Sequence, residues 1–248
     1  MTPAALALVG VTILGTSFVS GIFGMAGGLI LLGVLLMFMD VAPAMGVFGI
    51  IQMGSNGWRS ILWRSYVRWD LVARYVVGAS LAFFAMRFVA FVPDKALVYI
   101  GLGVLPFAAE LLPERYWPDI ERPSGPYICG AVIMVLQLMA GAAGHILDMF
   151  FQRGELDRKG VVATKAVCQT TAHLFRVLYF GTLVESFVSD IPLVAILAAL
   201  ALSFTGTSLA ASVLERMTDA DFRAWRRRIV HVVAVSFLIR GAWLLAFR

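Results

Sequence analysis

The chain has 248 residues and a net charge of +5, yet only 14% of its residues are charged and 60% are hydrophobic. Soluble domains average about 25% charged residues, and the mean hydropathy of this chain is +0.88. The composition therefore excludes a soluble protein and predicts an integral membrane protein. The basic residues cluster beside the ends of apolar segments, where they orient a membrane protein, so we expect no nucleic-acid partner.

Apolar stretches recur from end to end, and no polar region is long enough to form a separate soluble domain. The N-terminal segment lacks the positive region and the cleavage site of a signal peptide, so we expect it to be the first membrane helix. We predict a single transmembrane domain over residues 1–248 with helices at about 4–20, 27–39, 43–63, 69–91, 95–112, 125–141, 144–153, 159–181, 191–213 and 220–246.

These segments form two sets of five that resemble each other. Each set begins with an apolar run broken by glycines, GIFGMAGG at 21–28 and GAAGH at 141–145, and each continues with a helix that carries polar residues. We interpret this pattern as an internal duplication. The first repeat covers about 1–112, a cytoplasmic linker covers about 113–123, and the second repeat covers about 124–248.

Arginine placement predicts how the two repeats are oriented. The loop RSYVRWDLVAR of the first repeat is basic, whereas the matching loop GTLVESFVSD of the second repeat contains two acids and no base. The positive-inside rule places the first loop in the cytoplasm and the second outside. The predicted fold is an all-α polytopic membrane protein of two inverted repeats, each a glycine-broken re-entrant helix hairpin followed by about three transmembrane helices.

Each repeat also carries three polar residues on one helix face, because positions i, i+4 and i+7 share a face. The two triples, 117 residues apart, are Gln52, Asn56 and Arg59 in the first repeat and Gln169, His173 and Arg176 in the second. Lys165 lies one turn before Gln169 and extends the second stripe. Ionisable groups in membrane segments are costly and face a cavity or the bundle interior. We therefore expect the two stripes to face each other around one cavity rich in hydrogen-bond donors.

Two stretches resemble a known family. SGIFGMAGGLILLGVLL is similar to the first glycine-rich motif of the TauE/SafE sulfite exporter family, and DRKGVVATKAVCQTTAHLFRVLYFG resembles the corresponding region of its second repeat. The resemblance spans essentially the whole chain. It implies an exporter of small sulfur-containing anions, such as sulfite or organosulfonates, in the inner (plasma) membrane. The second break departs from many relatives, which have further glycines and a proline there, and it adds His145 and Asp148.

The residues themselves also favour anion chemistry. A small oxyanion accepts several hydrogen bonds, which amides, ammonium, imidazole and guanidinium groups can donate, and helix N-termini at the glycine breaks add N–H donors. The predicted substrate-binding set is Gln52, Asn56, Arg59, Lys165, Gln169, His173, Arg176, Gly24, Gly27 and Gly144. Candidates for proton coupling are His145, Asp148 and His173, which could change charge near neutral pH. No Walker motif is present, so active transport would use an ion gradient or a partner.

Structural interpretations compete with each functional one. Arg59 and Arg176 lie near helix ends and could reach the lipid headgroups, while Gln52, Asn56 and Gln169 could form interhelical hydrogen bonds. The glycines could serve only close helix packing, and the two cysteines, Cys129 and Cys168, are expected to pack in the core.

Alternative interpretations of the sequence are an anion channel, an assembly factor, or an intramembrane metalloenzyme that uses His145, Asp148 and His173. We expect a carrier with no enzymatic activity, no cofactor and no metal, and the sequence leaves open whether it forms a homodimer.

Overall fold

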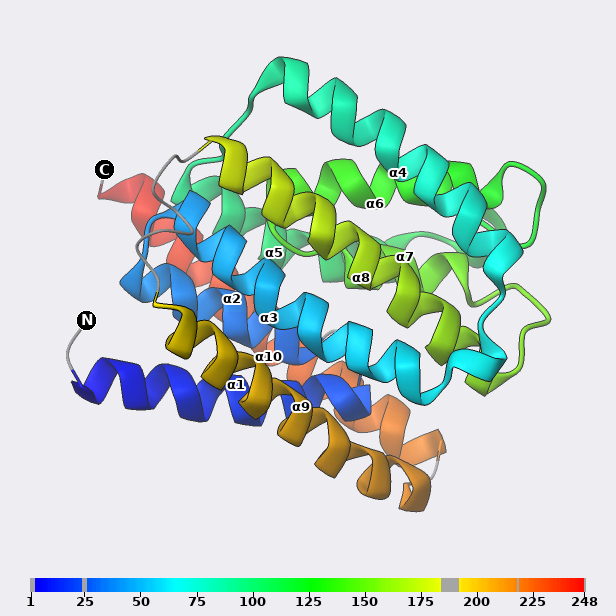
Figure 1. The fold of residues 1–248 in the computed structure, drawn as a ribbon. Coiled ribbons are helices and arrows are strands. Elements are labelled where there is room, and N and C mark those ends of the chain that lie inside the picture. The colour runs from blue at the N-terminus through cyan, green and yellow to red at the C-terminus, as the bar shows by residue number, and fades with distance from the viewer. Residues whose placement is uncertain (1–2, 24–25, 184–191, 218, 248) are drawn as a thin grey trace.

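The structure, a computed structural model, describes the backbone of residues 3–23, 26–183, 192–217 and 219–247. Every regular element in these ranges is helical (Figure 1). The first five α-helices are α1 (Pro3–Phe23), α2 (Ala26–Phe38), α3 (Val41–Leu62), α4 (Trp69–Val89) and α5 (Lys95–Leu111). The second five are α6 (Gly125–Ala140), α7 (Gly144–Phe150), α8 (Arg158–Leu183), α9 (Leu193–Arg216) and α10 (Asp219–Ala246). Short 3₁₀ turns, η1 (Arg64–Tyr66) and η2 (Glu114–Tyr116), follow α3 and α5.

The predicted helices are confirmed, each within a few residues of its expected ends. The boundaries have local causes. Asp94 accepts a hydrogen bond from the backbone N–H of Leu97, at 2.9 Å, and so caps the start of α5. The end of α6 is set by Gly141, whose φ of 84° is a left-handed conformation that favours glycine. The helix predicted at 144–153 ends earlier, at Phe150.

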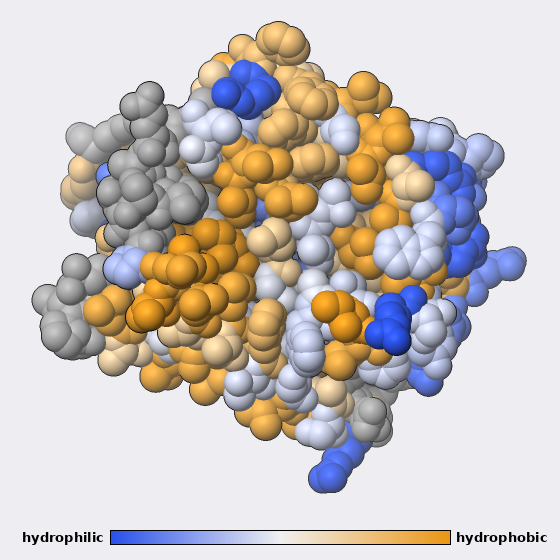
Figure 2. Space-filling view, in the orientation of Figure 1, coloured by the Kyte–Doolittle hydropathy of each residue, from blue (hydrophilic) through white to orange (hydrophobic). Residues whose placement is uncertain are grey.

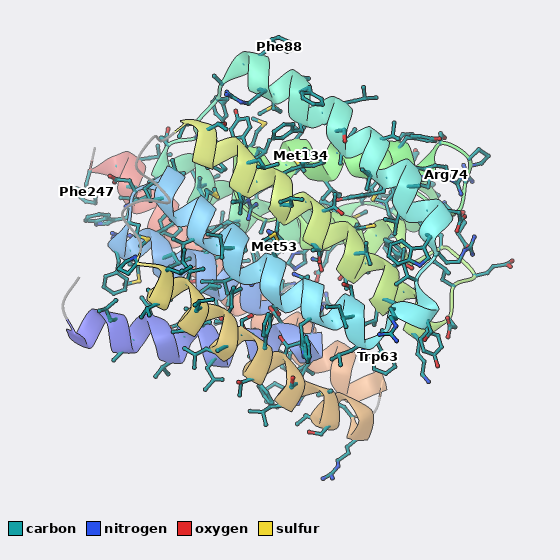
Figure 3. All side chains as sticks on the ribbon, in the orientation of Figure 1. Met53, Trp63, Arg74, Phe88, Met134 and Phe247 are labelled. Atoms are coloured by element: carbon teal, nitrogen blue, oxygen red, sulfur yellow. The ribbon has the colours of Figure 1, made fainter. Side chains whose placement is uncertain are left out.

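The molecule's outer surface suits a bilayer. Within the described residues, four helices, α1, α4, α9 and α10, are long and apolar enough to cross a membrane. Large apolar side chains on them face outward, and Phe88 of α4 is 91% exposed. Figure 2 shows apolar residues across the middle of this face, with hydrophilic residues gathered at the right end, where Figure 3 labels Arg74 and Trp63.

The polar helices α3 and α8 pack against each other and lie between α4 and α9 (Figure 1). Around them, α1 packs on α9, α4 packs on α6, and α5 packs on α10. Exchanging the first five helices for the last five converts the α1–α9 pair into the α6–α4 pair. The same exchange maps the α3–α8 and α5–α10 pairs onto themselves. The helix packing therefore has the pattern that a two-fold relation between the repeats requires.

The α3–α8 pair is antiparallel. A methyl group placed on Gly49 would meet the backbone of His173 and the side chain of Arg176, whereas one on Gly57, further along α3, would meet Thr170, earlier in α8. Figure 1 shows the same opposed directions for these two helices.

The α5–α10 pair is antiparallel as well. A methyl group on Gly103 would meet Leu238, and one on Gly241 would meet Ile100. A later residue of α10 thus meets an earlier residue of α5. A two-fold axis parallel to the membrane normal would leave each of these pairs parallel. Antiparallel pairs are what an axis in the membrane plane produces.

Candidate functional site

Both arginines of the polar stripes are buried inside the protein. Arg59 is 8% exposed and Arg176 is fully buried. Neither side chain therefore reaches the lipid headgroups, and the snorkelling interpretation is wrong for both. Gln52, Asn56 and His173 are buried too, while Gln169 is half-buried.

Each arginine holds the end of the first helix of its own repeat. Nη2 of Arg59 donates to the backbone oxygen of Ser20, at 2.8 Å, in the last turn of α1. Nη2 of Arg176 donates to the backbone oxygen of Gln137, at 2.6 Å, and also to that of Gly141, at the end of α6. The last carbonyl oxygens of a helix lack partners within it, and cations stabilise that end. Both arginines therefore act as caps on a broken helix, at the same separation of 39 residues.

The glycine breaks lie at these capped helix ends, where they allow helices to pack closely. Gly141 ends α6 and Gly144 begins α7. In the first repeat, a methyl group on Gly27 would meet the backbone of Thr16 and Ser20, so α2 lies directly against α1 there. Gly24 falls outside the described residues. The packing role of Gly27 is thus clear from its neighbours, and a direct substrate contact of these glycines remains a prediction.

A second group of residues gathers around Arg176. The guanidinium carbon lies 4.9 Å from the ring centre of Phe48 on α3, and the same ring meets His173 edge-on at 5.4 Å. Nδ1 of His173 lies 3.3 Å from Nε2 of Gln137. We call Phe48, Gln137, His173 and Arg176 the second polar centre. The sequence prediction missed Phe48 and Gln137, although Phe48 lies one turn before Gln52, as Lys165 does before Gln169.

The first polar centre consists of Ser20, Asn56 and Arg59. Asn56 donates through Nδ2 to the backbone oxygen of Gln52, at 2.9 Å, and lies 3.4 Å from its Oε1. Gln52 adjoins the start of α2, because a methyl group on Gly28 would meet Gln52 Nε2 and the ring of Phe48, each at 3.5 Å. Gln52 therefore lies between the two centres.

The two arginines are far apart. Arg176 is level with Gly49, and Arg59 lies ten residues further along α3, which at 1.5 Å per residue is roughly 15 Å. The two arginines therefore do not meet, and each caps the break of its own repeat. The expectation that the two stripes line one cavity remains a prediction. Met53, labelled on α3 in Figure 3, lies in the sequence between Gly49 and Arg59.

Several buried donors in these centres have no acceptor among the described residues. They are Nε and Nη1 of Arg176, Nε2 of Gln52 and Oγ of Ser20. Within the part of the chain that the structure describes, no carboxylate forms an ion pair with Arg59 or Arg176. A fully buried charge without a counter-charge is costly, so the second polar centre is suited to receive an anion.

Lys165 and Asp148 form an ion pair that joins α8 to α7. The two side chains are 19% and 8% exposed. Lys165, predicted as a substrate ligand, and Asp148, predicted as a proton-coupling residue, are thus brought together with each other. His145 lies one turn before Asp148 on α7. No group of three potential metal ligands gathers among the described residues, so they form no ligand set for the metalloenzyme alternative.

These features define a helical membrane protein in which paired broken helices are held by buried arginines, an arrangement typical of secondary transporters. The sequence profile of the sulfite exporter TauE/SafE family matches residues 8–238, so the chain belongs to this family of transporters. The predicted resemblance is confirmed. No curated protein and no solved structure matches the chain.

Proposed function

We propose that this protein exports small sulfur-containing anions, such as sulfite or organosulfonates, across the cytoplasmic membrane by alternating access, and that the second polar centre binds the anion. The observation that carries the proposal is Arg176, which is fully buried, has two nitrogen atoms without acceptors, and forms no ion pair within the described residues. An oxyanion supplies both the missing acceptors and the missing charge. Gln52, with a buried amide nitrogen in need of an acceptor, adds a neighbouring donor.

The repeats are proposed to be inverted across the membrane, with several crossings in each. The antiparallel α3–α8 and α5–α10 pairs and the basic loops at one end support this arrangement. In it, the two arginine-held breaks lie on opposite sides of the midplane, so each is suited to one of the two access states.

Export of an anion needs no coupled ion, because an inside-negative potential drives each negative charge outward by roughly 2.3 kcal/mol per 100 mV. His145, Asp148 and His173 are the proton-coupling candidates should the anion move against its gradient. The burial of Arg176 favours a carrier over an anion channel, since an open pore would hydrate the charge that binds the passing ion.

The test compares Arg176→Gln with Arg122→Gln, a matched change at a side chain that is 72% exposed in the linker. Sulfite binding to purified protein and sulfite efflux from liposomes are measured together with Tm. Because hydrogen bonds to charged groups contribute roughly 1.5–3 kcal/mol, we expect Arg176→Gln to weaken binding by about ten- to a hundredfold. Arg122→Gln should bind and transport like the wild type. Wild-type sulfite binding by Arg176→Gln would refute the assignment.

A further inference from the structure

The two repeats keep one register through the breaks and the stripe helices. Residues 117 positions apart are equivalent, so Gly24 matches Gly141 and Arg59 matches Arg176. The hydrogen bonds obey the same register, because Ser20 and Gln137 are equivalent and each accepts from the arginine of its own repeat. The arginines and glutamines of the stripes therefore recur, and they define what the two repeats share.

Four ionisable residues of the second break and stripe helix do not recur. In the second repeat, the residues His145, Asp148, Lys165 and His173 take the places of Gly28, Leu31, Phe48 and Asn56 in the first. The ion pair between Lys165 and Asp148 is thus the counterpart of two buried apolar residues, Phe48 and Leu31. The first repeat shows that these two positions of the fold accept buried apolar residues.

Stability does not account for the ion pair. Replacing a buried ion pair by well-packed apolar residues is often neutral or stabilising, because two charges lose their hydration when they are buried. The ion pair instead lies on the polar face of α8, where a positive charge can bind an anion. Lys165 lies on the same helix face as Gln169 and eleven residues before Arg176, which puts it level with Arg59. The contact of Lys159 with the ring of Trp63, at 5.7 Å, supports this alignment of α3 and α8.

Arg59, at this level of α3, forms no ion pair within the described residues, whereas the charge of Lys165 is offset by Asp148. The carboxylate of Asp148 thus occupies, on Lys165, the position that the oxygen of a substrate anion would take.

We propose that Lys165 is a second anion station on the transport path and that Asp148 is its tethered competitor. This inference rests on the proposed function. An arriving anion displaces the carboxylate from the ammonium group, and this displacement breaks the ion pair that ties α7 to α8. The short helix of the second break is then free to move, while the first repeat has buried apolar residues at the equivalent positions and no charge to displace. The first repeat thereby acts as the fixed partner of the second.

The primary experiment is sulfite titration of purified Asp148→Asn, which keeps the shape of the side chain and removes its charge. Freed from its competitor, Lys165 should bind sulfite about tenfold more tightly than in the wild type, as the loss of one charged hydrogen bond to Asp148 implies. Adding Lys165→Met to Asp148→Asn should abolish this gain and restore the wild-type affinity set by Arg176.

The matched control is the double variant Asp148→Leu with Lys165→Phe, which gives the second repeat the residues that the first repeat has at the equivalent positions. This variant carries no unpaired charge, so we expect Tm at or above that of the wild type and retained binding at Arg176. Sulfite efflux from liposomes should fall by about tenfold, the affinity difference assigned to the station. The control keeps the inference testable if Asp148→Asn folds poorly.

Wild-type affinity in Asp148→Asn, a gain that survives Lys165→Met, or wild-type efflux in the double apolar variant would each overturn the inference. Failure of the proposed function has a different outcome, because Arg176→Gln would then bind sulfite as the wild type does.

Discussion

At the scale of single residues, we propose that Arg176 combines a structural and a binding role through different nitrogen atoms. Nη2 of Arg176 is taken up by the backbone oxygens of Gln137 and Gly141, and Nε and Nη1 remain for a ligand. The charge is covered on one side by the ring of Phe48. An aromatic face attracts a cation without neutralising it, so the guanidinium keeps its positive charge for an anion.

Neighbouring glycines give a residue-scale prediction that separates folding from binding. Gly27→Ala places a methyl group against the backbone of Thr16 and Ser20, which cannot move aside, so we expect a loss of folded protein. Gly28→Ala meets only Gln52 and Phe48 side chains at ordinary contact distance. It should fold, but the methyl group would cover Nε2 of Gln52, the donor proposed to bind the anion, and so weaken sulfite binding by about tenfold, a loss of roughly one hydrogen bond. Folded yield and binding are measured for both.

The control for this pair is Gly57→Ala, whose methyl group would meet the side chain of Thr170 at 3.7 Å. It should match the wild type in yield, Tm and binding. Normal yield of Gly27→Ala would contradict the close packing of α1 and α2.

At the scale of elements, the helices could be predicted from the sequence because the apolar stretches and the glycines that end them are local features. The stripe at Gln52, Asn56 and Arg59 was placed on the buried face of α3 as expected. The sequence could not predict the partners of Arg59 and Arg176, because they are backbone oxygens, which every residue possesses. The Lys165–Asp148 pair was missed for a related reason: both residues were identified, but their contact depends on how α7 folds back on α8.

The helix caps give an element-scale prediction. Arg59→Gln should loosen the last turn of α1, and Arg176→Gln the last turn of α6, because each removes the donor to those carbonyl oxygens. Amide hydrogen exchange in the affected turn should accelerate about tenfold or more, as the loss of a charged hydrogen bond implies. The turn of the other repeat should exchange at its original rate. Acceleration in both turns with either variant would mean that the two breaks are not capped separately.

At the scale of the whole molecule, the repeats differ in what they add to one shared plan. Each has an arginine-capped break, a stripe helix and two outer helices, and the packing pairs are preserved when the repeats are exchanged. Glycines bring α1 close to α9 and α4 close to α6: a methyl group on Gly206 would meet the backbone of Leu14, and one on Gly78 would meet that of Tyr127. His145, Asp148, Lys165 and His173, in α7 and α8, have no ionisable counterpart in the first repeat. Under the displacement proposed above, the second repeat would be the mobile partner and the first the fixed one.

The inverted arrangement makes a prediction about membrane sides. Arg68 follows α3 in the first repeat, and Ser186, outside the described residues, follows α8 in the second, so these two loops are equivalent. In cells, Arg68→Cys should react with a membrane-impermeant maleimide only after the cytoplasm is opened, and Ser186→Cys should react from outside, because the first loop is basic and the second acidic. The native cysteines, Cys129 and Cys168, are buried and provide a low background. If both introduced cysteines react from the same side, the repeats are parallel, and the two arginine-capped breaks cannot serve opposite faces of the membrane.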